Sequence, residues 1–128
     1  MYIKPITYTD FNGNSLTENF MFNLSKAELI EMEADYPGGL QATIERITKE
    51  RDGKTIVAII KDLVLRSYGE RSLDGRRFVK SDEMRKEFSQ TDAYSELFME
   101  LAMNSDKMAE FVNNIVPNIP EAHKPAKG

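Results

Sequence analysis

The sequence predicts a mainly α protein of the α+β class, in which an N-terminal β-hairpin precedes a compact bundle of about five to six helices. Two observations predict this class. Residues 4–22 alternate apolar and polar side chains on either side of an Asn-Gly turn, whereas residues 25–116 repeat apolar side chains at helical spacing between capping signals. A chain of 128 residues is long enough for one modest core. We therefore expect a single globular domain over residues 1–117 and a flexible tail over residues 118–128.

The hairpin comes first in the chain. Ile6 and Tyr8 lie on one side of its first strand and two threonines on the other, and a second alternating run covers about residues 15–22. Between the two runs, Asn12-Gly13 is a strong turn signal because both residues tolerate positive φ. A lone hairpin is marginally stable, so we expect it to lie against helices or another strand.

Three helices are expected between the hairpin and residue 68. Ser25 caps the first, and Glu28 three residues later completes a capping box. The second covers about residues 39–51 and the third about residues 54–68. The third is the most apolar, with apolar side chains over more than half of its circumference, and this predicts the central core helix. Those side chains are Ile56, Val57, Ile59, Ile60, Leu63, Val64 and Tyr68.

The remaining chain begins with a polar excursion over residues 70–83, around an Asp74-Gly75 turn. Three more helices are expected after it, and Pro117 ends the last of them. The residues expected to cap these three helices are Ser81, then Thr91 or Ser89, then Ser105 or Asp106.

Catalytic and metal-binding equipment is missing from the sequence. There is no cysteine, which excludes disulfides and thiolate zinc sites, and the only histidine, His123, falls in the tail. Residues 10–15 imitate the start of a calcium loop, but Ser15 and Met21 stand where an EF-hand needs glycine and glutamate. We therefore expect no catalytic residue, no metal, no cofactor and no enzymatic activity.

Charge and hydropathy narrow the functional class further. A formal net charge of −4 argues against a strongly phosphate-seeking surface, so a nucleic-acid partner is not expected. The longest apolar run is interrupted by Lys61 and Asp62, too early to span a bilayer, and the first ten residues lack the pattern of a signal peptide. We expect a soluble intracellular protein without a membrane partner.

One segment departs from the acidic average. Residues 66–86 hold seven basic and four acidic side chains, and the central bases are Arg71, Arg76, Arg77 and Lys80. This excess would steer an acidic protein or a phosphate backbone. It is also what a solvated loop looks like. The four bases are one candidate partner-binding set.

Methionines supply the second candidate set. Met99 and Met103 lie one helical turn apart, nearly opposite the core stripe of their helix, and Met108 and Phe111 of the next helix are expected to join them. Methionine adapts to varied apolar partners but also fills gaps in cores. Either another helix of the chain covers this face, or a partner helix or a second copy does.

Two blocks of the chain, "DGRRFVKS" and "AYSELFMEL", are distinctive, and neither contains a catalytic motif. Through these blocks most of all, the chain from about Ile6 to Pro117 resembles the tail assembly chaperones of long-tailed bacteriophages and related prophages. The resemblance implies a non-catalytic protein of the host cytoplasm that binds the tape-measure protein. It would keep that protein soluble while tail-tube subunits assemble, and it would be absent from the mature virion.

Two other classes of protein remain open at this point. One is a structural head–tail connector or minor tail protein, which would persist in the finished particle. The other is a small nucleic-acid-binding regulator that uses the basic segment from Arg71 to Lys80.

Overall fold

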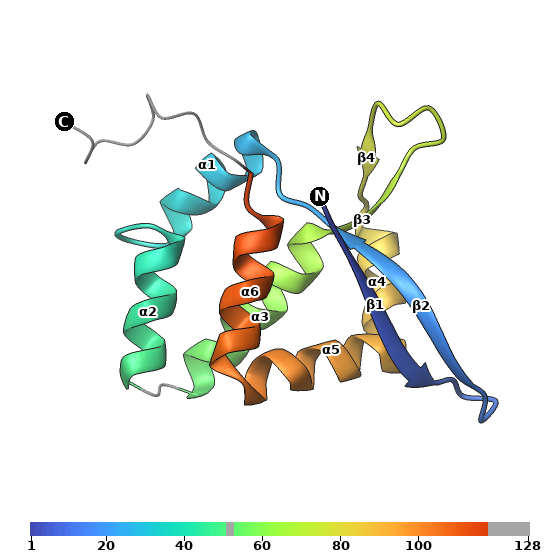
Figure 1. Ribbon diagram of the computed structural model, residues 1–128. Helices are drawn as coiled ribbons and strands as arrows, with labels where there is room; N and C mark the ends of the chain where they lie inside the picture. The colour runs from blue at the N-terminus through green and yellow to red at the C-terminus, as the bar shows by residue number, and fades with distance from the viewer. Residues whose placement is uncertain (51–52, 118–128) are drawn as a thin grey trace.

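The computed structural model describes residues 1–50 and 53–117 and has the α+β architecture that the sequence predicts (Figure 1). An N-terminal hairpin is followed by six helices within the described residues. The fold-class prediction is thus confirmed. The expected tail at 118–128, with His123, and the expected end of the second helix at Arg51 lie outside the described residues.

The hairpin consists of β1 (Tyr2–Thr9) and β2 (Ser15–Phe22), which pair antiparallel from Tyr2–Phe22 to Thr9–Ser15. Its turn is stabilised by Asp10, whose carboxylate accepts hydrogen bonds from the backbone N–H groups of Asn12 and Asn14 at 2.9 and 2.8 Å. Gly13 has a φ of +85°, which is why glycine suits that position. The turn expected from Asn-Gly is confirmed.

Two further strands extend the hairpin into a four-stranded antiparallel sheet with the order β1-β2-β3-β4. They are β3 (Tyr68–Arg71) and β4 (Phe78–Val79), which fall within the stretch expected to be helix and polar loop. No strand is predicted after residue 22, and these two strands correct that expectation. Strands this short show too little alternation to detect, and β3 pairs with the distant β2 through Met21–Gly69.

Gly69 explains how strand β4 lies so close to β3. A Cβ atom at Gly69 would lie 2.6 Å from the carbonyl oxygen of Val79 and 2.7 Å from the ring of Phe78. Any larger residue would therefore push these two groups away. The helix that precedes β3 ends at Ser67, two residues before Gly69.

The first three helices are α1 (Lys26–Asp35), α2 (Leu40–Glu50) and α3 (Gly53–Ser67). The predicted capping box is present, because Ser25 and Glu28 exchange side-chain to backbone hydrogen bonds of 2.8 and 3.0 Å. Helix α3 occupies the core as expected. Two of its expected core residues differ, since Val57 is exposed and Tyr68 belongs to β3.

The last three helices are α4 (Asp82–Ser89), α5 (Asp92–Met103) and α6 (Ser105–Ile115). Ser81 and Thr91 cap the first two as predicted. The cap of α6 is Asn104 and not Ser105 or Asp106. Its side-chain oxygen accepts from the backbone N–H groups of Asp106 and Lys107 at 2.9 and 3.1 Å. Asn104 also ends α5, so one residue separates the two helices.

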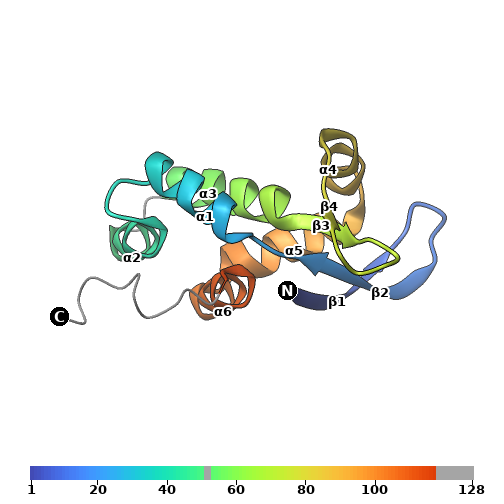
Figure 2. The same cartoon turned by 90° about the horizontal axis from the view of Figure 1, so that it is seen from above.

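The core lies where the inner face of the sheet meets α3, α5 and α6, and aromatic rings fill its sheet side. The rings of Tyr68 and Phe88 stack with centroids 4.2 Å apart, and Phe22 contacts Phe111 edge-on at 5.3 Å. Figure 2 shows α1 and α2 at one end of the molecule and the turn of the β1–β2 hairpin projecting at the other. Within the described residues, no helix has the length and apolar content needed to cross a membrane.

Candidate functional site

Exposed apolar side chains mark the surfaces that a partner would use. The large ones among the described residues are Met1, Ile3, Phe11, Ile30, Val57, Leu73, Met99 and Met103. Met99 and Met103 are the pair that shares one helix, one turn apart. Leu73 lies within the basic segment. The two candidate regions from the sequence therefore both include exposed apolar groups.

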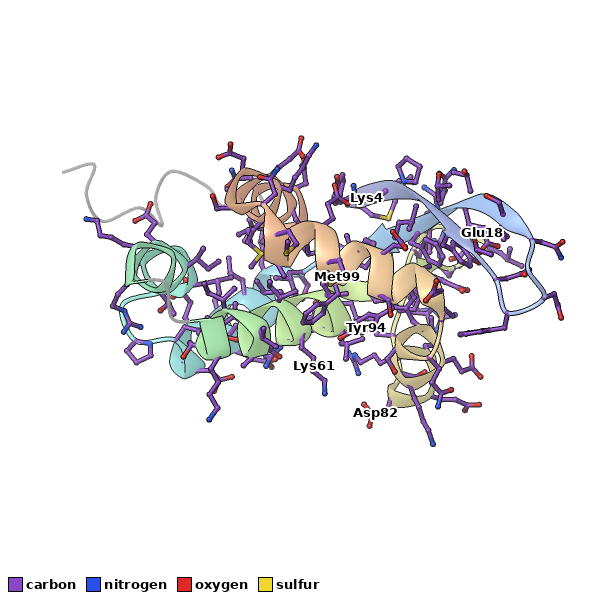
Figure 3. All side chains as sticks on the ribbon, turned by 90° about the horizontal axis from the view of Figure 1, so that it is seen from below. Lys4, Glu18, Lys61, Asp82, Tyr94 and Met99 are labelled. Carbon is purple, nitrogen blue, oxygen red and sulfur yellow. The ribbon has the colours of Figure 1, made fainter. Side chains whose placement is uncertain are left out.

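Met99 and Met103, here called the methionine face, lie on the outside of α5. Their side chains are 55% and 77% exposed, whereas Leu97 and Leu101 of the same helix are buried. Helix α5 packs its other side against β1 and α3, with an ion pair between Lys4 and Glu100 at 3.3 Å. Figure 3 shows Met99 on the side of the molecule that also carries Tyr94 and Lys61. No described helix covers the face.

The two other residues of the methionine set lie elsewhere. Met108 and Phe111 are 6% and 1% exposed. Phe111 contacts the rings of Tyr2 and Phe22 at 5.9 and 5.3 Å, so α6 turns its apolar side toward the hairpin. The expectation that both residues extend a partner-binding surface is corrected: both belong to the buried core, where Phe111 packs on rings of the hairpin.

The central part of the basic segment, residues 72–77, forms the turn between β3 and β4 and is held by hydrogen bonds. The Asp74 carboxylate accepts from the backbone N–H of Arg76 at 3.0 Å and from the hydroxyl of Ser72 at 2.7 Å. These two bonds, the backbone one first, lower the pKa of Asp74. Ser72 also bonds the backbone of Arg77 twice, at 2.8 and 3.0 Å. The segment is thus a closed turn, and its arginines remain exposed to solvent.

Three of the four candidate bases project from this turn. Arg71, Arg76 and Arg77 are exposed, and across residues 1–50 and 53–117 their guanidinium groups make no hydrogen bond or ion pair. Leu73 is fully exposed beside them. The three arginines and Leu73 are here called the hairpin tip. Leu73 is not among the candidate residues taken from the sequence. Its position directly before Asp74-Gly75, between arginines, is the pattern that indicates an exposed apolar side chain there.

Lys80 does not belong to the hairpin tip. Its ammonium group lies 2.8 Å from both carboxylate oxygens of Glu28 and 2.7 Å from the carbonyl oxygen of Asn23, and its side chain is 10% exposed. Burial lowers the pKa of Lys80, against the opposing effect of Glu28. Lys80 therefore joins β4 to the start of α1. Its expected role in partner binding is corrected to a structural one.

Several tyrosine hydroxyls among the described residues have raised pKa values. The hydrogen bond to Glu18 raises the pKa of Tyr8 to about 12, and burial followed by a hydrogen bond to Asp62 raises that of Tyr36. A raised tyrosine pKa weakens the residue as a base or nucleophile at neutral pH. Among the described residues, no three His, Cys, Asp or Glu side chains gather as metal ligands would.

A groove between α1, α3 and α4 is lined mostly by charged side chains, and several of them pair with one another. Asp62 receives two nitrogens of Arg66 at 3.0 and 3.2 Å. Arg85 donates to the carbonyl oxygen of Leu65 at 2.9 Å and to Asp82 at 3.1 Å. The Asp62–Arg66 pair lies within α3 and the Asp82–Arg85 pair within α4, whereas the bond from Arg85 to Leu65 joins α4 to α3. The two candidate surfaces from the sequence that expose large apolar groups are the methionine face and the hairpin tip.

Comparison with known proteins adds one match. A family model described as phage tail assembly chaperone matches residues 1–124 of the 128-residue chain. No curated protein and no solved structure matches the chain. The matched range contains the whole described fold and both candidate surfaces, and it agrees with the resemblance of the sequence.

Proposed function

The chain belongs to the phage tail assembly chaperone family, and we propose that it binds the tape-measure protein and keeps it soluble while the tail tube is built. Membership establishes a role in tail assembly and tail proteins as partners. The tape-measure protein is the partner that we select among them. Catalysis has no part in this proposal, since the family is generally non-catalytic.

The methionine face is the single observation that carries this choice. A chaperone needs apolar contacts that are adaptable and reversible, together with enough charge to stay in solution. Met99 and Met103 provide flexible, polarizable side chains on a rigid helix, and they are exposed although the same helix buries its leucines. Their spacing of one turn matches the apolar repeat of a helical client.

The size of the face suits repeated, displaceable binding. Fully burying a methionine side chain contributes about 1.5–3 kcal/mol, so two of them give a weak contact once the entropy of association is subtracted. Many weak contacts along one long helical client would solubilise it, and assembling tube subunits would still displace them. We place this activity in the host cytoplasm, and we expect the protein to be absent from the mature virion.

Co-expression tests the proposal. Producing the cognate tape-measure protein with this chain should raise the soluble yield of the tape-measure protein. Met99→Ser with Met103→Ser should abolish the gain, because serine cannot fill an apolar site. A matched control, Ile3→Ser with Phe11→Ser, removes two exposed apolar residues from another surface and should keep it. No gain with the unmodified chain would contradict the proposal.

A structural connector or minor tail protein would behave differently, because it would remain in the finished particle. Peptide mass spectrometry of purified virions separates the two classes. The proposal predicts that peptides of this chain are lost on purification, whereas stoichiometric retention would establish the structural role.

A further inference from the structure

The three guanidinium groups of the hairpin tip have no partner within the described residues, although hydrogen bonds fix the conformation of the turn. The turn is closed by hydrogen bonds of Ser72 and Asp74, and Figure 1 shows it standing clear of the helices above the sheet. Leu73 is fully exposed there, and Arg71, Arg76 and Arg77 are exposed around it. A fixed apolar side chain surrounded by free guanidinium groups is suited to dock on an apolar spot bordered by carboxylates.

Helix α1 offers a surface of that kind on the same chain. Its second half exposes Glu31, Glu33 and Asp35, and no basic residue lies in its last turn. Of the three carboxylates, Asp35 is the one with a nearby cation, Arg66 at 3.7 Å. Ile30 is well exposed at the start of this half, and its helical neighbours Ala27 and Ala34 are too small to cover it.

Helices α4 and α5 lack this combination. Helix α4 exposes Asp82, Glu83 and Glu87 but no large apolar residue. Helix α5 exposes two methionines with one free carboxylate, Glu96, since Glu100 pairs with Lys4. Helix α1 therefore complements the hairpin tip in both charge and apolar content, which α4 and α5 do not.

A single copy cannot bring the two surfaces together. Lys80 fixes the base of the β3–β4 hairpin to the start of α1 through Glu28, while the tip extends away from α1 in both Figure 1 and Figure 2. The contact must therefore join two molecules. We propose that the hairpin tip of one copy docks on α1 of a second copy, with Leu73 on Ile30 and Arg76 and Arg77 facing Glu31 and Glu33.

This inference is independent of the methionine face, and it leaves that face free for the client. The interacting charges are exposed, so the contact is screened by salt. One contact uses the hairpin tip of the first molecule and α1 of the second. The unused α1 and hairpin tip of the pair either form a second contact that closes the dimer or bind further copies.

A charge exchange tests the contact. Sedimentation velocity on the full chain would be compared for wild type, Arg76→Glu with Arg77→Glu, and Glu31→Lys with Glu33→Lys. None of the four side chains has a partner within the described fold, so both variants should melt like wild type. Wild type should self-associate, with an association constant about tenfold lower at about 0.5 M than at about 0.05 M salt. Over that range the Debye length shortens from roughly 14 to roughly 4 Å. Each variant alone should stay monomeric, because like charges face each other.

Mixing the two variants should restore association, since reversed tips then meet reversed helices. Leu73→Ser should weaken wild-type association with the same salt dependence. Glu83→Lys with Glu87→Lys on α4 is the matched control and should leave it unchanged. Three results would overturn the proposal: a wild type that stays monomeric, variants that associate alone, or a mixture that stays monomeric. Salt-sensitive binding of duplex DNA by a monomeric wild type, lost in Arg76→Glu with Arg77→Glu, would assign the tip to nucleic acid instead.

Discussion

Helices α5 and α6 carry similar apolar residues on either side of Asn104, but those residues have opposite surroundings. Met103 is 77% exposed five residues before Met108, which is 6% exposed. The basic segment repeats the contrast, because Arg76 and Arg77 are exposed whereas Lys80 is held by Glu28. Residue type alone therefore does not separate a partner-binding side chain from a structural one. The element packed opposite it does.

Among the substitutions at buried residues, Phe111→Ala should lower the free energy of unfolding the most. The ring is buried against Tyr2 and Phe22, so truncation leaves a cavity between α6 and the sheet. We expect a loss of about 3–5 kcal/mol in the free energy of unfolding, measured by urea denaturation. A loss similar to that of an exposed residue would mean that α6 does not pack on the hairpin.

Lys80→Ala should have the next largest effect. The substitution leaves the Glu28 carboxylate and the Asn23 carbonyl without their shared donor in a partly buried place. We expect a loss of about 1–3 kcal/mol in the free energy of unfolding. Arg77→Ala is the matched control in the same segment and should change it by less than about 0.5 kcal/mol. Equal effects at both positions would remove the distinction drawn between them.

Asn104→Ala tests the junction of the two helices. Asparagine caps α6 through two backbone N–H groups, and alanine cannot accept those hydrogen bonds. The expected loss in the free energy of unfolding is about 1 kcal/mol. Asn104→Ser should recover most of it, because serine is also a good cap.

The smallest of the expected effects is the loss of stability at low pH that follows protonation of Glu28. Burial alone would raise the pKa of Glu28, but hydrogen bonds from Lys80 and Ser25 reverse this and leave the pKa below its ordinary value of 4.5. The unfolded chain therefore takes up the proton first, so the stabilisation is complete above pH 4.5 and is lost as the pH falls below it. Chemical denaturation across this range should show a steeper decline for wild type than for Glu28→Gln. Parallel declines would contradict the assignment.

The parts of the fold predicted from sequence have local causes. Asn12-Gly13 sets the hairpin turn, and Ser25 with Glu28 sets the start of α1, through contacts within a few residues. The strands β3 and β4 were missed because their pairing depends on distant β2 and on the close approach at Gly69. Lys80 was misassigned for the same reason, since its partner Glu28 is 52 residues away in sequence.

In the candidate site, too, the features with local causes are predicted from the sequence and those that depend on distant residues are not. A helical wheel places Met99 and Met103 away from the core stripe of α5, and their exposure confirms that placement. The wheel of α6 also has an apolar side, but only the tertiary structure shows the hairpin rings of Tyr2 and Phe22 against Phe111 on that side. Whether a partner binds the exposed pair stays a prediction.

Affinity for the tape-measure protein tests that prediction most directly. Isothermal titration of a soluble helical fragment of that protein would compare wild type with Met99→Ser and Met103→Ser combined. Both side chains are exposed, so the variant should unfold within about 0.5 kcal/mol per substitution of wild type. It should bind at least about tenfold more weakly, which corresponds to about 1.4 kcal/mol. An unchanged Kd in a fully folded variant would contradict the methionine face as the client surface.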